Sequence, residues 1–317
     1  MNSEKWMWTA ITLLLALTII GIVIYGLATI APDQTASSQV SDGAPSPQGG
    51  QSTSNGVTAS GDTALPPVPS MDQVPEGPLG EAIKLGYKLM NETNTLLPNN
   101  VGNQLACSSC HGNAGLDSTS PFIGVTAVFP QYNARAGKVL TIEERINGCF
   151  LRSMNGKPLD YTSNEMKAMV AYLTYISEGV PTGTKERPWV VKNYISDRPT
   201  PNKENGEKLY QQACMQCHGA DGSGTGPTTG PALWGDNSFN IGAGIARIGT
   251  MAGYIKRNMP LAPMGGINKG DLTDQEAVDL AAYILSHDRP DFAPKANDWP
   301  NGDAPDDVPY ETTAKKK

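Results

Sequence analysis

Two copies of a Cys-x-x-Cys-His motif constrain this chain of 317 residues more than any other feature, and they contain four of its five cysteines. In such a motif both thiols attach to haem vinyl groups as thioethers, and the histidine becomes the proximal iron ligand. A zinc site would need further ligands, of which only His287 and Cys149 remain, and a redox dithiol would not require a histidine in each copy. The sequence therefore predicts two covalently bound c-type haems. The expected attachment residues are Cys107, Cys110 and His111 for the first haem and Cys214, Cys217 and His218 for the second.

Similar segments flank both motifs, so the chain contains a divergent repeat. A helical segment precedes each motif, at 81–90 and 205–210, and an amphipathic segment follows it, at 163–176 and 273–285. The last segment begins with Thr273 and Glu276, which fit a capping box. The pattern predicts two mainly α domains, over residues 79–198 and 199–293, that each run helix, motif, irregular loop and helix. Two prolines, in Arg-Pro-Thr-Pro at 198–201, favour a boundary there.

Few side chains can supply the second axial ligand of the second haem. His287 ends the closing helix and is interpreted as a surface or capping residue, so two bis-histidine haems are not expected. Met259 stands in an Asn-Met-Pro sequence that resembles the distal-ligand loop of class I cytochromes c. We therefore expect two class I cytochrome c domains in tandem, with Met259 as the ligand in the second. Met251 and Met264 are the alternatives, and Met264 stays open.

Cys149 is the one cysteine outside the two motifs, and it lies in a positively charged window. Residues 135–157 contain the cations Arg135, Lys138, Arg145, Arg152 and Lys157 but only the acids Glu143 and Glu144. Nearby cations stabilise a thiolate and attract a dianionic substrate. The spacing to the closing helix matches that of Met259, although the pair Met154 and Met264 would satisfy it too. We expect Cys149 to ligate the first iron, the alternative being a buried inert thiol.

Pro121 and Pro231 each follow a motif. We expect their carbonyls to accept hydrogen bonds from the proximal imidazoles and so fix the orientation of both rings.

An uncharged apolar run extends from Met7 to Ile30. About 20 such residues cross a bilayer as a helix, whereas the apolar core of a cleaved signal peptide, the alternative, spans about 7–15 residues. We expect a membrane anchor over residues 1–30. Lys5 precedes the run while Asp33 and Asp42 follow it, which favours haem domains on the periplasmic or outer face of a bacterial inner membrane.

The remaining segments are polar. Residues 31–78 are rich in Ser, Gly, Pro, Gln and Thr, a composition that cannot bury enough apolar surface to fold and therefore predicts a flexible tether. Residues 294–317 end in three lysines and are expected to form a solvated polar tail. A formal net charge of −7 argues against nucleic acid as a partner.

Three segments around Cys149, at 130–135, 144–149 and 152–156, resemble dihaem thiosulfate dehydrogenases. The resemblance extends from about residue 78 to residue 292, and the apolar run and the tether lie outside it. It implies His111 and Cys149 as the axial pair of a catalytic haem, with substrate-side residues Arg135, Arg145 and Ser153. His218 would bind a second haem that passes electrons on. Some members have a lysine where this chain has Asn258, so a plain histidine–methionine pair is expected there.

The resemblance also implies a reaction, the oxidation of two thiosulfate ions to tetrathionate with an accepting cytochrome or terminal oxidase as partner. Arginines would offset the repulsion between two dianions through forked hydrogen bonds. A membrane-tethered electron shuttle is an alternative that would not need Cys149 or its arginines. A sulfur-oxidising Sox-type cytochrome is another, although the 135–153 segment resembles it less well. The same site could also run in reverse as a tetrathionate reductase.

Overall fold

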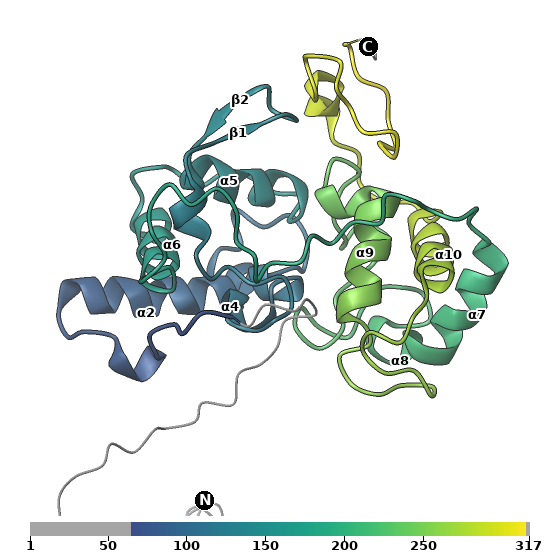
Figure 1. Cartoon of the computed structure of the whole chain (residues 1–317), viewed down its shortest axis with the longest axis horizontal. Coiled ribbons are helices and arrows are strands. Elements are labelled where there is room, and N and C mark those ends of the chain that lie inside the picture. Colours follow the sequence, from purple (N-terminus) through teal and green to yellow (C-terminus); the bar gives the residue numbers. More distant parts are fainter. Residues whose placement is uncertain (1–64, 315–317) are drawn as a thin grey trace, which may run out of the picture. The chain divides into compact units, whose positions relative to one another are not determined.

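The computed structural model of the chain describes residues 65–314 (Figure 1). The expected membrane anchor lies outside the described residues, as does most of the expected tether. No helix within 65–314 has the length and apolar character needed to cross a bilayer. The described part is mainly helical, which confirms the expected fold class at that level.

The first haem domain is built on the crossing of α2 (Pro78–Asn91) and α6 (Asn164–Tyr175), which bury one apolar face of each helix between them. Gly86 lies where the two backbones approach, since a Cβ there would come within 2.1 Å of the Ala168 carbonyl oxygen. The hydroxyl of Ser163 accepts the Met166 backbone N–H and so starts α6. Fully burying a side chain such as Leu89 or Met166 stabilises this pair by about 1.5–3 kcal/mol.

The second domain repeats this arrangement with α7 (Lys203–Ala213) and α10 (Asp274–Leu285). Gly206 takes the place of Gly86, because a Cβ there would lie 2.1 Å from the Asp279 carbonyl oxygen. Thr273 and Glu276 form the expected capping box at the start of α10. The same close contact in both domains is the structural counterpart of the sequence repeat.

The stretch between each motif and its closing helix contains a third helix, so the expectation of an irregular loop is wrong there. These helices are α5 (Ile142–Arg152) and α9 (Ile248–Asn258). A capping box of Thr141 and Glu144 starts α5, and the apolar side of each helix packs into the core of its own domain.

Shorter elements complete the described part. Strands β1 (Gln131–Asn133) and β2 (Lys138–Leu140) form an antiparallel hairpin with Tyr132 opposite Val139. The short helical segments are η1 (Met71–Gln73), α3 (Thr93–Leu96), η2 (Cys107–Ser109), α4 (Gly112–Gly115), η3 (Val125–Val128), α8 (Met215–His218), η4 (Gly244–Ala246) and η5 (Ala293–Asn297).

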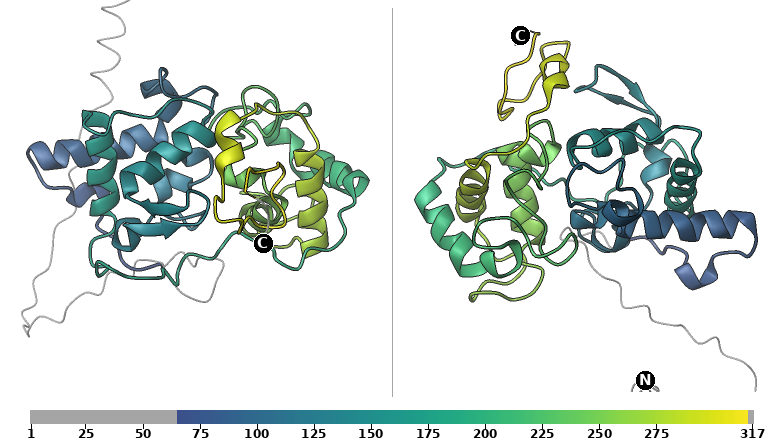
Figure 2. Two further views of the ribbon diagram at one scale, coloured as in Figure 1. Left: turned by 90° about the horizontal axis from the view of Figure 1, so that it is seen from above. Right: turned by 180° about the vertical axis from the view of Figure 1, so that it is seen from behind.

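Two segments expected to be solvated are packed instead. The last residues of the expected tether contact the first domain, because Val74 is buried and the Ser70 carbonyl accepts the Tyr175 hydroxyl at 2.7 Å. In the expected C-terminal tail, Trp299 is only 4% exposed, and its backbone N–H donates to the Arg135 carbonyl. Figure 2 shows this yellow segment beside the β1–β2 hairpin. Residues 293–314, here called the C-terminal strap, therefore belong to the folded part.

Candidate functional site

Each motif histidine is oriented by a backbone carbonyl. The Nδ1 atom of His218 lies 2.8 Å from the Pro231 oxygen, as expected, but Nδ1 of His111 lies 2.7 Å from the oxygen of Ser120 and not of Pro121. The Pro121 carbonyl accepts Arg187 Nη1 at 3.1 Å instead. The two loops from motif to proline differ in length, so matching prolines do not place matching carbonyls. Because a carbonyl only accepts, Nδ1 is the donor in both rings and Nε2 is left to bind a metal.

A cavity of about 300 Å³ opens beside the first motif. Its lining includes Cys107, His111, Arg145, Cys149, Met154 and Arg187. Burial, together with the charges of Arg145 and Arg187, lowers the pKa of His111 to about 4, which keeps the imidazole neutral. A neutral imidazole, an attachment thiol and a further sulfur around one largely apolar cavity form a donor set that fits a c-type haem.

Cys149 and Arg145 meet at this cavity because they lie four residues apart on α5, which places them on one face of the helix. Arg145 Nη1 donates to Cys149 Sγ at 2.9 Å, and the charge of Cys149 raises the pKa of Arg145. Cys149 is half-buried and Arg145 is exposed. A thiol held by a guanidinium at the edge of a cavity does not fit the description of an inert core thiol.

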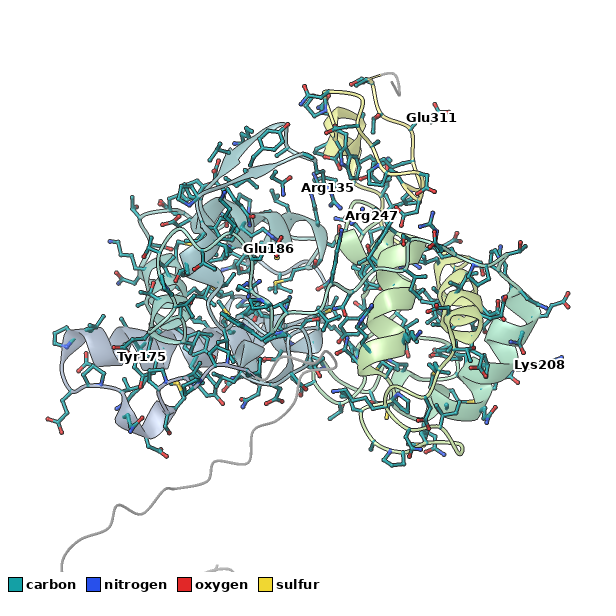
Figure 3. All side chains as sticks on the ribbon, in the orientation of Figure 1. Arg135, Tyr175, Glu186, Lys208, Arg247 and Glu311 are labelled. Atoms are coloured by element: carbon teal, nitrogen blue, oxygen red, sulfur yellow. The ribbon has the colours of Figure 1, made fainter. Side chains whose placement is uncertain are left out.

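Arg135 lies outside the residues that line the cavity. It follows β1, and Figure 3 labels it together with Arg247. Its Nη1 donates to the Gly242 carbonyl at 2.9 Å, and its guanidinium lies 4.9 Å from the centre of the Trp299 ring. Burial and the neighbouring charge of Arg152 lower the pKa of Arg135 to about 10. The cations of the predicted positive window therefore lie in two places, because Arg145 lines the cavity and Arg135 lies outside its lining.

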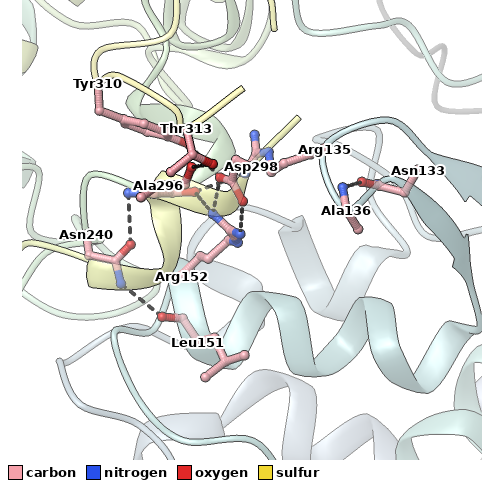
Figure 4. Close-up of polar contacts among 11 residues, drawn as sticks. Asn133, Arg135, Ala136, Leu151, Arg152, Asn240, Ala296, Asp298, Tyr310 and Thr313 are labelled. Carbon is pink, nitrogen blue, oxygen red and sulfur yellow. Dashed lines mark hydrogen bonds and ion pairs between the residues drawn. The ribbon is translucent and has the colours of Figure 1, made fainter. Parts of the chain in front are cut away.

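That second location is an arginine cluster, formed by Arg135, Arg152 and Arg247 and covered by the C-terminal strap. Arg152 makes a forked pair with the Asp298 carboxylate, with distances of 2.8 and 2.6 Å (Figure 4). Arg247 lies above the same Trp299 ring as Arg135 and 3.9 Å from Asp307. The strap thus brings two carboxylates to three guanidinium groups.

Ser153 is the C-cap residue of α5, and its backbone carbonyl accepts Asn103 Nδ2 at 2.9 Å. It is not among the residues that line the cavity. Of the four predicted catalytic residues, the structure brings Cys149 and Arg145 together beside His111 and leaves Arg135 and Ser153 outside the lining.

Sequence reasoning missed the segment after α6, which contributes Arg187, Lys192 and Asn193 to the cavity. Arg187 also donates to the Ile123 carbonyl at 3.2 Å, next to the Pro121 carbonyl that it already holds. The available signal was three cations close together, Lys185, Arg187 and Lys192, just before the domain boundary.

In the second domain, Met259 is the C-cap residue of α9 and packs, partly buried, against the hydrophobic core of that domain. Met251 is 3% exposed inside α9, and Met264 lies in a loop where it pairs with Ile267. His287 stacks on Trp234 with ring centroids 4.0 Å apart, and its Nδ1 contacts the Tyr283 carbonyl, as suits a residue that closes a helix. The motif thiols and His218 fit a c-type haem, and Met259 supplies a thioether in the same domain.

Comparison with known proteins identifies both domains. Residues 98–182 match the family model described as SoxA/TsdA, cytochrome c domain, and residues 203–288 match the model described as cytochrome c. A thiosulfate dehydrogenase of Psychrobacter arcticus is 45% identical over 257 residues, which are 79% of this chain and 76% of that protein. One from Allochromatium vinosum is 42% identical over 240 residues, 73% of this chain and 87% of the relative.

The chain is also similar to a solved structure, thiosulfate dehydrogenase (TsdBA) from Marichromatium purpuratum in its as-isolated form. The TM-score is 0.66 at 36% sequence identity, and the match covers 71% of this chain. It covers 50% of the solved chain, so this chain spans half of that longer protein.

Proposed function

This chain belongs to the thiosulfate dehydrogenase family of c-type cytochromes, and from that premise we propose how its own residues oxidise thiosulfate. It is an enzyme, an oxidoreductase that acts on thiosulfate. We assign one haem c to each cytochrome c domain. Bound haem supplies a one-electron acceptor, and every other part of the reaction falls to side chains of the protein.

The proposed reaction joins two thiosulfate ions. One sulfur–sulfur bond forms between their terminal sulfurs, tetrathionate results, and two electrons leave for the bound acceptors. The charge changes from four negative units on the two substrates to two on the product and two on the electrons. Since two dianions must approach each other, a positively charged site lowers the barrier.

The contact of 2.9 Å between Arg145 and Cys149, within the cavity that contains His111, is the observation that carries this assignment. We propose that His111 and Cys149 would hold the iron of the first haem. Arg145, which is exposed where it lines the cavity, is positioned to bind a sulfonate group through its planar fork.

Arg135 and Ser153 take different roles in this proposal. Arg135 belongs to the arginine cluster and adds to the positive potential that attracts dianions, without lining the cavity. Ser153 ends the helix that contains both Arg145 and Cys149, and its proposed role is to position that end of α5, where its backbone carbonyl accepts Asn103 Nδ2.

In the second domain, we propose that His218 and Met259 would hold the iron of the second haem, where a thioether ligand would favour a higher reduction potential. We propose that this domain delivers electrons to an accepting cytochrome or a terminal oxidase. An anchor over residues 1–30 would hold both domains at the periplasmic face of the membrane.

The test is thiosulfate oxidation by the purified full-length protein with ferricyanide as acceptor. Arg145→Gln is expected to lower kcat/KM by about 10- to 1000-fold, the usual range for removing a group that stabilises developing charge. Lys138→Gln is the matched control, because Lys138 is an exposed cation that pairs with Glu144 at 2.7 Å. Equal activity in both variants would contradict the role of Arg145.

A further inference from the structure

Helix α9 belongs to the second domain, yet one of its side chains reaches the first haem motif. The hydroxyl of Tyr254 donates to the backbone carbonyl of Cys110 at 3.2 Å. Cys110 is one of the two residues expected to attach the first haem, whereas Met259 directly follows the last residue of α9. A single helix thus contacts one haem-attachment loop and presents the proposed ligand of the other haem.

The side of α9 that faces the first domain permits close backbone contact. A Cβ on Gly253 would lie 2.3 Å from the backbone nitrogen of Tyr194, and one on Gly249 would lie 2.9 Å from the Ile195 carbonyl oxygen. The Ile195 N–H donates to the Gly249 carbonyl at 3.0 Å. Two glycines one helical turn apart therefore dock α9 directly on the segment that leaves the first domain.

Asn193, at the start of that docked segment, joins the two haem sites through its side chain. Its Nδ2 donates to Ser120 Oγ at 2.7 Å, and its Oδ1 accepts Asn258 Nδ2 at 3.3 Å. The carbonyl of the same Ser120 lies 2.7 Å from Nδ1 of His111. A series of hydrogen bonds therefore runs from the proximal histidine of the first site to the residue that precedes Met259.

We propose that Asn193 and Tyr254 are positioning residues that hold α9 against the first haem motif and thereby set the rate of electron exchange between the two haem sites. In each exchange one site loses an electron and the other gains it, with no further reactant. The proposal rests on the proposed function in one respect, the assignment of Met259 to the second haem.

The side chains of Tyr254 and Asn193 have the chemistry needed to keep these hydrogen bonds. Burial raises the pKa of Tyr254 well above its usual range, so the hydroxyl remains a donor to the Cys110 carbonyl. Asn193 lines the first cavity and uses its amide as a donor on one side and as an acceptor on the other. A neutral hydrogen bond contributes only a small part of the stability of a folded domain, so removing both connections should loosen α9 without unfolding the domain.

The experiment compares Tyr254→Phe, Asn193→Leu and the double variant with wild type, all as full-length protein with both haems bound. One haem is reduced rapidly by a photochemical reductant, and electron exchange is followed through the different absorption of the two haems. Tyr175→Phe is the matched control, since its hydroxyl also donates to a backbone carbonyl, that of Ser70, but within the first domain. Hydrogen exchange of the α9 amides provides a readout that does not depend on turnover.

Exchange between the haems is expected to slow by about tenfold in the double variant, since small displacements of reacting groups have effects of at least this size. Amide protection of α9 should fall in parallel, and Tyr175→Phe should match wild type in both measurements. An unchanged exchange rate in the double variant overturns the proposal. Tyr254→Phe alone keeps the ring and its packing, so the hydroxyl contact stays testable if the double variant does not fold.

Reduction of the first haem by thiosulfate, measured on the same samples, separates this proposal from the proposed function. Failure of thiosulfate to reduce wild-type protein refutes the function while leaving the exchange measurement with a photochemical reductant intact. Normal thiosulfate reduction with unchanged exchange in the double variant refutes only the roles of Asn193 and Tyr254.

Discussion

Single side chains decide which chemistry each haem site can support. On α5, the four-residue spacing of Arg145 and Cys149 brings a cation to a sulfur, and His111 completes the set from another element. A thiolate stabilises ferric iron, whereas a thioether favours the ferrous form. The assignment of Cys149 to the first site and Met259 to the second therefore implies a potential difference that favours electron flow towards the second domain.

The ligand of the second haem can be tested by comparing two methionines. Met259→Ala is expected to change the spectrum and potential of the second haem, because it removes the proposed iron ligand at the end of α9. Met264→Ala should leave both unchanged, since Met264 belongs to a loop that pairs with Ile267. Redox titration followed by absorption measures both variants, and the reverse pattern would assign the ligand to Met264.

Helices position these side chains. Some of these helices could be predicted from the sequence and others could not. The closing helices were foreseen because Ser163 and Thr273 begin amphipathic segments, and both residues do cap their helices. Helices α5 and α9 were missed, although Thr141 and Glu144 form a capping box before Cys149. In α9, Gly249 and Gly253 permit close contact with another segment, the one that contains Tyr194 and Ile195. Such contacts between distant segments leave no local signal.

The close contacts of α2 with α6 and of α7 with α10 give a prediction for stability. Gly86→Ala and Gly206→Ala would each place a Cβ 2.1 Å from a backbone carbonyl oxygen, which forces the helices apart. We expect each substitution to lower the free energy of unfolding of its own domain by about 1–3 kcal/mol, the usual cost of overpacking. Chemical denaturation followed by haem absorption measures the loss. Lys84→Ala on the exposed side of α2 is the control and should change stability by less than about 0.5 kcal/mol.

At the scale of the whole chain, the C-terminal strap contacts residues of the arginine cluster that lie far from it in sequence. The two motifs alone predict two cytochrome c domains, which the comparisons confirm, and the attachment residues within them stay a prediction. The packing of the strap could not be predicted, because Asp298 and Trp299 stand in a polar sequence and acquire their partners only from Arg152 and Arg135. Ser120, and not Pro121, orients His111 because the loop from motif to proline is shorter in the first domain than in the second, which similar motifs do not indicate.

Asp298→Asn tests the strap. The substitution removes the charged partner of Arg152, whose side chain is 20% exposed, from a pair in which Asp298 is 6% exposed. Stability is expected to fall by about 1–3 kcal/mol, because a mostly buried guanidinium loses its partner. Asp291→Asn is the matched control, since Asp291 pairs with Lys295 while 69% exposed, and a surface pair contributes about 0–1 kcal/mol. Equal unfolding midpoints would show that the strap is not held by this pair.

Cys149 carries the central claim, and the most direct measurement combines EPR of the oxidised protein with thiosulfate turnover. In Cys149→Gly the signal of the first haem should change, its potential should rise and thiosulfate oxidation should largely disappear, because an anionic iron ligand is lost. Met154→Leu is the control, since Met154 lines the same cavity and is the competing sulfur. It should keep both the signal and the activity. An unchanged first-haem signal with retained thiosulfate oxidation in Cys149→Gly would contradict the account.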